Sequence, residues 1–479
     1  MLFNSFSFAI FLPIVFILYW VLPHRFRWLV LLISSYYFYM SWNVKYVVLI
    51  LGTTFISYIT ALLLEKTDNP KLKKLSLAAA AIISLGVLFF FKYFNFFQDS
   101  LIAALSVFAI KLHPTTLNLL LPVGISFYTF QTLSYVIDVY KGDVPAEHHF
   151  GKYATFISFF PQLVAGPIER TSNLLPQINQ EHHFSYDKAS YGMKLMVWGF
   201  FKKLVIADVF ASYADKVFDA PHAFKGFALI LATLFFTIQI YCDFSGYSDI
   251  AVGCAKLLDI DLMQNFKSPY FSASIKEFWS RWHISLSTWF KDYVYIPLGG
   301  NRRGKLRTNL NLIITFLVSG LWHGANWTFV IWGGIHGFLQ VIEKNLFKNA
   351  QVKKFSFSWV IRVIIVFCIC SFAWIFFRAN TFREAVIIIS NLFYGLDTGI
   401  FNYLLNGFYN IGFSMETFIV PLLSILILAV YDFCSLKTDV IAWISSKHIV
   451  IRYSVYLFML VFIMLFKASG EAVFVYFQF

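Results

Sequence analysis

The sequence predicts an all-α protein that crosses a membrane many times, and three observations lead to this class. Of its 479 residues, 59% are hydrophobic and only 13% are charged, whereas a soluble domain carries roughly 25% charged residues. Apolar runs recur along the whole chain, near the ~20 residues that a helix needs to cross a ~30 Å hydrocarbon core. No long polar tract separates them, which leaves no room for a separate soluble domain.

The apolar runs place the expected helices in chain order, with about 11 to 13 crossings in total. The first group is expected over residues 7–22, 28–64 (two helices broken near Trp42 and Asn43), 76–97, 101–112, 117–140 and 152–166. The second group is expected over residues 190–213, 226–257, 275–298, 310–345 (broken by glycine-rich turns), 358–378, 384–400, 415–434 and 450–468.

The segment 275–300 is too polar for a helix that faces lipid. It mixes aromatic residues with Lys276, Glu277, Arg281, His283, Lys291 and Asp292. Charged groups at membrane depth are costly unless they face a protein interior or a watery cavity, and irregular backbone has the same requirement. We therefore expect re-entrant or interfacial helices that line a funnel.

The formal net charge of +13 is spread over short basic clusters between the apolar runs. These are Arg25 with Arg27, Lys71–Lys74, Lys202 with Lys203, Arg302–Arg307, and Lys353 with Lys354. This is the distribution of cytoplasmic loops, and it places the amino terminus outside because nothing basic precedes Arg25. Such loops attract anionic lipid headgroups or an anionic cytosolic substrate. Nucleic acid is excluded, because its binding domains gather charge on one soluble face.

His323 is the strongest candidate for a chemical role. It lies between glycines in SGLWHGANW (319–327), inside an otherwise apolar run. Glycines let another backbone or a ligand approach closely. An imidazole within the membrane can accept a proton from a hydroxyl group, and desolvation would keep it neutral, as a general base requires. The alternative is a histidine that only hydrogen-bonds across a helix pair.

A second cluster, FWSRWHISLS (278–287), places His283, Arg281 and serine hydroxyl groups within three turns. The aromatic residues could line a tunnel for a thin acyl-pantetheine arm. Arg281 and the basic turn with Arg302 and Arg303 could meet phosphates. The alternative is an interfacial helix with aromatic-belt and snorkelling residues.

A third cluster, YCDFSGYSD (241–249), puts Asp243 and Asp249 in an apolar helix. Buried acids need partners. They could orient a histidine or bind a substrate group, but the favoured interpretation is structural, with Arg281 or Lys256 as the paired cation.

The remaining histidines and cysteines suggest no metal site. No histidine pair has the spacing of a zinc site on a helix. We expect the polar-loop histidines to be solvated and the thiols to be buried, namely His113, His148, His149, His182, His183 and His222, and Cys242, Cys254, Cys368, Cys370 and Cys434. On an ideal helix, His336 would face away from His323, although the glycine-rich break leaves this open. The sequence also lacks a nucleophile motif, a Walker loop and a Rossmann glycine pattern, so direct transfer is the simplest enzymatic interpretation.

Six short strings in order resemble the markers of one known family. They are LPVGISFY (121–128), AGPIER (165–170), DFSGY (243–247), RWHISLS (281–287), YIPLGG (295–300) and GLWHG (320–324). The chain resembles the membrane-bound O-acyltransferases (MBOAT), in particular the bacterial alginate O-acetyltransferase branch, nearly from end to end. The resemblance implies a many-helix funnel, formed by a catalytic core over 1–380 and additional membrane segments over 381–479 within one membrane domain.

The resemblance also implies residue roles and partners. His323 would be catalytic and His283 would occupy the second active-site position. Substrate contacts are expected from Arg281, Ser285, Asp243, Ser245, Trp322, Asn326, Arg302 and Arg303. The acyl donor would be acetyl-coenzyme A or an acyl carrier protein, with no bound cofactor or metal. The acyl group would cross the bacterial inner membrane and reach a polysaccharide, through an extracytoplasmic partner protein.

Three alternatives remain open at this stage. The family also includes the teichoic-acid D-alanyl transferases, whose donor is an aminoacyl carrier protein. A transporter or flippase would use the intramembrane charges as a permeation path, but no inverted repeat is visible. A purely structural subunit of an export complex would need neither histidine.

Overall fold

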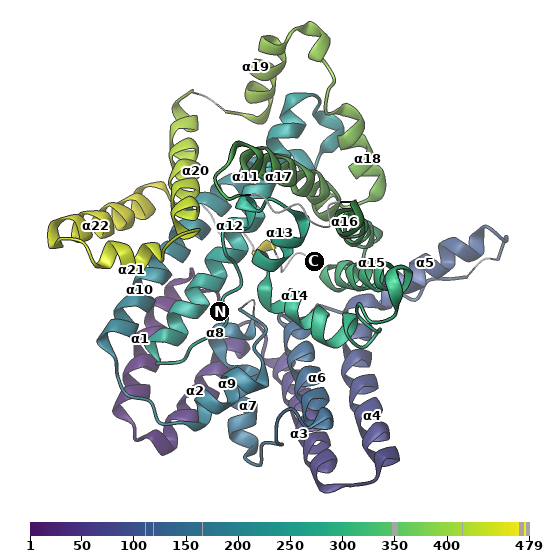
Figure 1. Cartoon of the computed structure of the whole chain (residues 1–479), viewed down its shortest axis with the longest axis vertical. Helices are drawn as coiled ribbons and strands as arrows, with labels where there is room; N and C mark the ends of the chain where they lie inside the picture. The colour runs from purple at the N-terminus through teal and green to yellow at the C-terminus, as the bar shows by residue number, and fades with distance from the viewer. Residues whose placement is uncertain are drawn as a thin grey trace. The chain divides into compact units, whose positions relative to one another are not determined.

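The computed structural model describes residues 1–110, 112–117, 119–164, 166–346, 353–413, 415–468 and 474–475. All regular structure in these residues is helical (Figure 1), as the sequence predicts. The chain forms two compact units. The first unit contains Met1–Met193 and Ile250–Met263, and the second contains Lys194–Asp249 and Gln264–Phe479.

The first unit is built mainly from the amino-terminal helices. They are α1 (Phe6–Val21), α2 (His24–Met40), α3 (Val47–Lys66), α4 (Pro70–Leu88), α5 (Phe94–Ser106), α6 (Ile125–Lys141), α7 (Phe150–Ser158), α8 (Phe160–Leu163), α9 (Thr171–Asn179), the start of α10 (Tyr186–Phe200) and the end of α12 (Phe227–Leu257). Side-chain caps define several starts: the Ser5 hydroxyl accepts from Phe8 N, and Asn69 accepts from Lys71 N just before α4. Such caps satisfy amides that have no partner within the helix.

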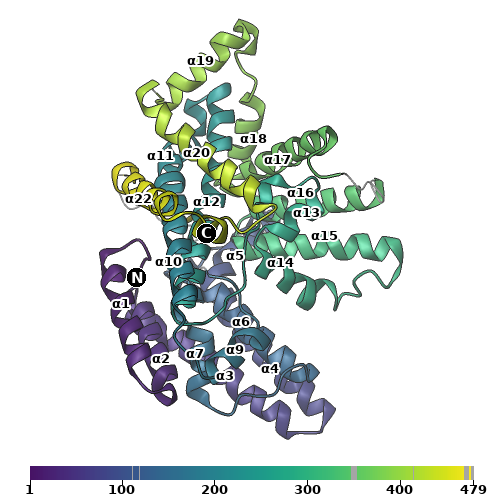
Figure 2. The same ribbon diagram turned by 60° about the vertical axis from the view of Figure 1, so that its left-hand side comes forward.

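The second unit holds the rest of α10 and α12 and the helices that follow. These are α11 (Asp208–Phe218), α13 (Ile275–Arg281), α14 (Ile284–Phe290), α15 (Gly304–His323), α16 (Trp327–Leu346), α17 (Phe357–Arg378), α18 (Phe382–Asn391), α19 (Ile400–Ile411), α20 (Met415–Ser435), α21 (Val440–Ser445) and α22 (Ile449–Phe466). Figure 2 shows α15 and α16 side by side, as Figure 1 does.

Six helices among the described residues are long and apolar enough to cross a membrane. They are Val44–Lys66, Pro70–Ser106, Phe227–Leu257, Phe357–Arg378, Phe418–Ser435 and Ile449–Phe466. The shorter Phe6–Val21 is also apolar. These helices agree with the membrane class that the composition predicts.

Several expected boundaries are correct and others are wrong. The break at Trp42 and Asn43 is confirmed between α2 and α3. The separate helix expected over 101–112 is wrong, because α4 and α5 form one helical segment, with a π turn at Phe89–Tyr93, that ends at Ser106. The polar residues near 98–100 interrupt the apolar pattern without breaking the helix. The helix expected from 117 begins only at Ile125, after Gly124 with φ of 75°.

Two of the five cysteines contradict the expectation of buried thiols. Cys242, Cys254 and Cys370 are buried, but Cys368 and Cys434 are exposed on α17 and α20. Both helices are candidate membrane spans. In a membrane the surroundings are as apolar as the interior, so an apolar sequence context does not distinguish a buried thiol from a lipid-facing one.

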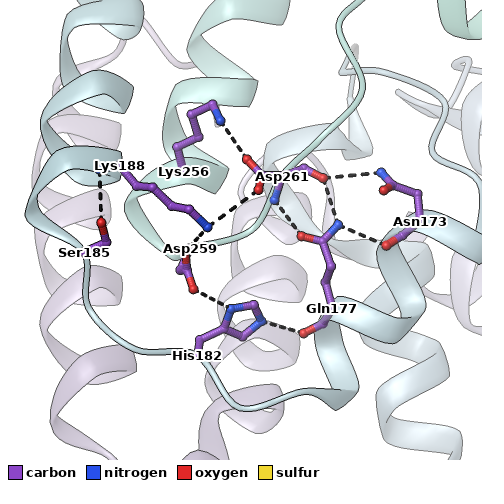
Figure 3. A network of polar contacts seen from close by, with 8 residues as sticks. All are labelled: Asn173, Gln177, His182, Ser185, Lys188, Lys256, Asp259 and Asp261. Carbon is purple, nitrogen blue, oxygen red and sulfur yellow. Dashed lines mark hydrogen bonds and ion pairs between the residues drawn. The ribbon is translucent and has the colours of Figure 1, made fainter.

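A polar network holds the chain segment after α12 within the first unit (Figure 3). His182 Nδ1 lies 3.0 Å from Asp259 Oδ2, and His182 Nε2 lies 2.6 Å from the carbonyl oxygen of Gln177. Asp259 also pairs with Lys188, and Asp261 pairs with Lys256 at 2.7 Å. His182 is only 4% exposed, so the expectation that it is solvated is wrong. Its partner Asp259 lies 77 residues away in the sequence, so the polar residues near His182 in the sequence do not indicate that it is buried.

Candidate active site

The hairpin of α15 and α16 carries His323. The histidine is the last residue of α15, and Gly324, Ala325 and Asn326 separate it from α16. Asn326 Oδ1 accepts from Thr328 N at 3.1 Å, and Asn326 Nδ2 donates to the carbonyl oxygen of Asn380 at 2.7 Å. The predicted glycine-rich break is therefore confirmed, and Asn326 serves as its cap.

Two glycines bring α15 and α16 into direct backbone contact. A Cβ atom added to Gly320 would lie 2.2 Å from the carbonyl oxygen of Phe329, and one added to Gly333 would lie 2.2 Å from that of Phe316. No side chain fits at such distances, so the close approach requires glycine. The crossing lies within one turn of His323, and it therefore helps to set the position of the imidazole.

His283 occupies the junction between α13 and α14. Its φ of 43° is unusual for a residue other than glycine. The junction is held by Asn265, whose carbonyl oxygen accepts from Ile284 N at 2.9 Å and whose Oδ1 accepts from Ser285 Oγ at 2.7 Å. Such a backbone costs roughly 1–3 kcal/mol and is concentrated at functional sites. Ser285, expected to contact substrate, thus fixes this junction.

The structure brings His283 and His323 together. Their ring centroids are 6.4 Å apart, and both side chains are buried. Phe244 packs edge-on against His283 at 4.5 Å, and Trp322 lies 5.0 Å from His323. Two histidines from separate motifs thus lie beside each other within aromatic surroundings.

Further aromatic residues complete the enclosure of His323. The Trp332 ring lies 5.1 Å from it and the Phe377 ring lies 5.4 Å from it, measured between centroids. No sequence motif pointed to these two residues, because α16 and α17 reach the site only through the folding of the hairpin. In the sequence, the closeness of a histidine to bulky aromatic residues is only a weak indication that they enclose it.

The carboxylates of the third cluster are paired with lysines. Asp243 Oδ1 lies 2.6 Å from Lys203 Nζ, and Asp249 Oδ2 lies 2.7 Å from Lys202 Nζ. Lys202 also donates to Ser245 Oγ at 2.9 Å. The structural interpretation of these acids fits this geometry, but the expected cations, Arg281 and Lys256, are not their partners.

Lys202 and Lys203 were expected in a basic cytoplasmic loop, and that expectation is wrong. Both are buried, with 3% and 5% exposure, on a π turn at Phe201–Ala207. Two carboxylates inside an apolar helix require buried cations. A pair of lysines inside an apolar run was therefore the sequence feature that could have identified these buried cations.

The predicted basic residues differ in their distance from the histidines, because Arg281 is two residues from His283 whereas Arg302 and Arg303 lie before the other end of α15. Arg281 pairs with Glu277 Oε1 at 2.7 Å and donates to the carbonyl oxygen of Lys267. Arg302 and Arg303 are exposed just before α15. At 1.5 Å per residue, Arg303 is ~30 Å from His323 along this helix. Arg302 and Arg303 can therefore meet a donor only at a distance from His323.

His336 lies on the same side of the hairpin as His323. The ring centroid of Trp332 is 5.1 Å from each of the two histidine rings. The break at 324–326 folds α16 back along α15, so the ideal-helix expectation of opposite sides does not apply. In the part of the chain that the structure describes, no three His, Cys, Asp or Glu side chains are grouped so that they could hold a metal ion.

Comparisons with known proteins identify the family of this chain. Residues 145–379, which include both histidines, match the family described as MBOAT, membrane-bound O-acyltransferase. A probable alginate O-acetylase AlgI from Pseudomonas syringae pv. tomato is 44% identical over 384 residues, which cover 80% of this chain and 73% of the relative.

Two further relatives carry other names. A peptidoglycan O-acetyltransferase from Helicobacter pylori is 36% identical over 427 residues, covering 82% of this chain and 80% of the relative. A teichoic acid D-alanyltransferase from Streptococcus thermophilus is 32% identical over 268 residues, covering 52% of this chain and 63% of the relative. The chain belongs to the membrane-bound O-acyltransferase (MBOAT) family, and it is therefore a multi-pass membrane enzyme of the O-acyltransferase class.

Proposed function

We propose that this enzyme transfers an acetyl group from a cytosolic thioester towards hydroxyl groups of an extracytoplasmic polysaccharide. The observation that carries the proposal is the pair of buried histidines, His283 and His323, whose rings lie 6.4 Å apart within an aromatic enclosure. The long matches to proteins named as alginate and peptidoglycan O-acetylating enzymes support acetyl as the acyl group. The polymer itself is an alginate-like or related envelope polysaccharide.

His323 acts as the general base in the proposed reaction. A neutral His323 accepts the proton of the acceptor hydroxyl while the hydroxyl oxygen bonds to the thioester carbonyl carbon. When the resulting tetrahedral species collapses, the C–S bond breaks and the thiolate takes up the proton from His323. The base is thus restored and no net proton is consumed. General-base help of this kind is typically worth about 10²- to 10⁴-fold in rate.

His283, whose ring lies 6.4 Å from that of His323, assists the proposed transfer. Asn265 accepts from Ile284 N and Ser285 N just after His283, and Lys267 N donates to the carbonyl oxygen of Arg281 just before it, so the ring is pre-positioned. We assign it to hydrogen bonding with the reacting oxygen or its developing charge, where a fixed donor is most effective. Trp322 and Phe244 exclude water, which would otherwise hydrolyse the thioester.

The donor approaches from the basic end of α15. Arg302, Arg303 and Lys305 are exposed there and suit the phosphates of acetyl-coenzyme A or of a carrier protein. In this proposal the basic turn lies in the cytoplasm and the amino terminus lies outside, with about 11 to 13 membrane crossings in total. A partner protein outside the membrane then delivers the acetyl group to the polysaccharide.

D-Alanyl transfer to teichoic acid is the less favoured acyl chemistry. The matched D-alanyltransferase covers 52% of this chain, whereas the relatives named for O-acetylation cover 80% and 82%. A transporter without covalent chemistry would not need two buried histidines that lie beside each other among aromatic residues.

The test measures transfer from radiolabelled acetyl-coenzyme A by the full chain in nanodiscs. The parent is compared with His323→Ala and His283→Ala, each checked for a monodisperse, folded protein. Loss of labelled product in His323→Ala, with donor binding kept, is expected. Parental transfer by a folded His323→Ala protein would overturn the catalytic assignment. Transfer of D-alanine but not acetyl from a carrier protein would overturn the proposed acyl group.

A further inference from the structure

One face of α16 carries three buried polar side chains at intervals of four residues. Thr328, Trp332 and His336 each have 0% exposure. Within the described part of the chain, Thr328 Oγ1, Trp332 Nε1 and His336 Nε2 have no hydrogen-bond partner. Residues four apart lie above one another on a helix, so these groups form a row.

The tautomer of His336 is determined by Trp279. Trp279 Nε1 donates to His336 Nδ1 at 3.3 Å, so Nδ1 must be the acceptor nitrogen. The ring proton of His336 then lies on Nε2. Trp332 Nε1 can only donate. The row therefore presents two fixed N–H donors, one turn apart.

The row leads away from His323 towards the basic end of α15. Gly333 contacts Phe316 and Gly337 contacts Ile313, so the two helices run antiparallel. Trp332 lies next to His323, at 5.1 Å between rings, and His336 lies one turn further along. This is the direction from which the proposed donor enters.

Two adjacent buried donors without an acceptor are costly. Each such group loses the hydrogen bond to water that it makes in the unfolded chain, and native proteins rarely leave such groups unsatisfied. A ligand with two acceptor oxygens at the matching interval would remove this cost. Positions 332 and 336 differ by about 6 Å along the helix axis, an interval that suits consecutive amides of an extended chain.

We propose that Trp332 Nε1–H and His336 Nε2–H donate to the two amide carbonyl oxygens of the pantetheine arm that carries the acyl thioester. This inference rests on the proposed function. Trp332, nearer to His323, contacts the amide nearer to the thioester, and His336 contacts the second amide. The arm is common to coenzyme A and to the prosthetic group of a carrier protein, so the same residues serve either donor.

The donor analogues give a sharp test, read as thiol release by the full chain in nanodiscs. S-Acetyl-N-acetylcysteamine keeps only the amide nearer to the thioester, whereas acetyl-coenzyme A has both. Trp332→Phe keeps a ring but loses the N–H, and it should raise KM for both donors by about 3- to 10-fold with kcat nearly unchanged. His336→Phe, combined with Trp279→Phe so that no donor is orphaned, should raise KM for acetyl-coenzyme A alone.

Trp374→Phe is the matched control. Trp374 is buried and stacks on Trp332 at 5.5 Å, but its Nε1 already donates to the Tyr270 hydroxyl. Its loss should leave KM for every donor at the parental value.

Acetylated carrier protein is assayed in parallel with acetyl-coenzyme A, and this comparison identifies which donor supplies the pantetheine arm. The rise in KM caused by Trp332→Phe should appear with whichever donor the parent uses. An active parent whose KM is unaltered by Trp332→Phe would overturn the inference alone. A parent inactive with every donor would overturn the proposed function and this inference with it.

Discussion

Lys203 and Asp243 form a buried ion pair of 2.6 Å in the second unit, although 40 positions separate them in the sequence. Lys203 also lies 2.8 Å from Asp208 Oδ1, so one ammonium group serves two carboxylates. Asp243 Oδ2 in turn accepts from Val475 N at 2.7 Å. A single cation thus links α11, α12 and the described carboxyl-terminal residues.

Lys203→Met should strongly destabilise the protein, because it leaves two buried carboxylates without their cation. Removing one partner of a buried pair costs about 3–5 kcal/mol. The melting temperature, followed by fluorescence-detected size-exclusion chromatography, should fall by many degrees. Lys216→Met is the control. Lys216 is exposed, and its hydrogen bond to the Ile411 carbonyl oxygen is long, at 3.5 Å. Its loss should therefore change stability by less than about 0.5 kcal/mol. Equal melting temperatures for the two variants would contradict the ion-pair role.

Asp259→Asn should destabilise the first unit much more than Asp261→Asn does. Asp259 accepts from both His182 and Lys188 and its side chain is 16% exposed, whereas that of Asp261 is 52% exposed. Asn tolerates the φ of 61° at position 259, so the change tests charge and not backbone. We expect a loss of about 1–3 kcal/mol for Asp259→Asn and about 0–1 kcal/mol for Asp261→Asn. Thermal melts of both variants in one detergent decide this, and similar losses would refute it.

Glu169 should make the stability of the first unit fall as pH rises. Burial raises the pKa of Glu169 to about 7, although Asn173, Met263 N and Arg170 favour its ionised form. In the unfolded chain a glutamate titrates near ~4.3. The folded state therefore binds more protons between these two values, and the free energy of unfolding decreases with pH across that window.

Glu169→Gln removes this titration but can keep an acceptor for Met263 N. Its melting temperature minus that of the parent should increase steadily from pH 5 to pH 7.5 and then level off. A difference that is constant over this range would show that Glu169 does not titrate there.

The sequence predicts the helical class correctly, and it singles out His283 and His323 as candidates for a physical reason. Polar residues are so costly in an apolar chain that His283 and His323 stand out without any structure. The same argument fails for Lys202 and Lys203, because a basic pair looks alike in a loop and beside buried acids. It also fails for Trp332 and His336, whose importance depends on how α16 folds back along α15. Local sequence patterns thus identify polar residues that are costly to bury, whereas the partners of these residues are set by long-range contacts.

Gly333→Ala should reduce both activity and stability, whereas Gly334→Ala should have little effect. A Cβ atom at 333 would lie 2.2 Å from the Phe316 carbonyl oxygen, which is backbone and cannot move aside by itself. At 334 the nearest atom is Leu317 Cδ2, at an ordinary 3.4 Å. Since α15 ends in His323, forcing the helices apart displaces the imidazole from His283, and a shift of about 1 Å can cost roughly 10²-fold in rate.

The two glycine variants differ by one position on the same helix, so helix propensity cancels. Alanine favours a helix over glycine by about 1 kcal/mol at either position, and Gly334→Ala should therefore melt at or slightly above the parental temperature. Acyl transfer and melting temperature are measured on both proteins in nanodiscs. If Gly333→Ala kept parental transfer and stability, the backbone contact of α15 with α16 would not be what positions His323, and the hairpin would have to be held by its aromatic neighbours Trp332 and Phe377 instead.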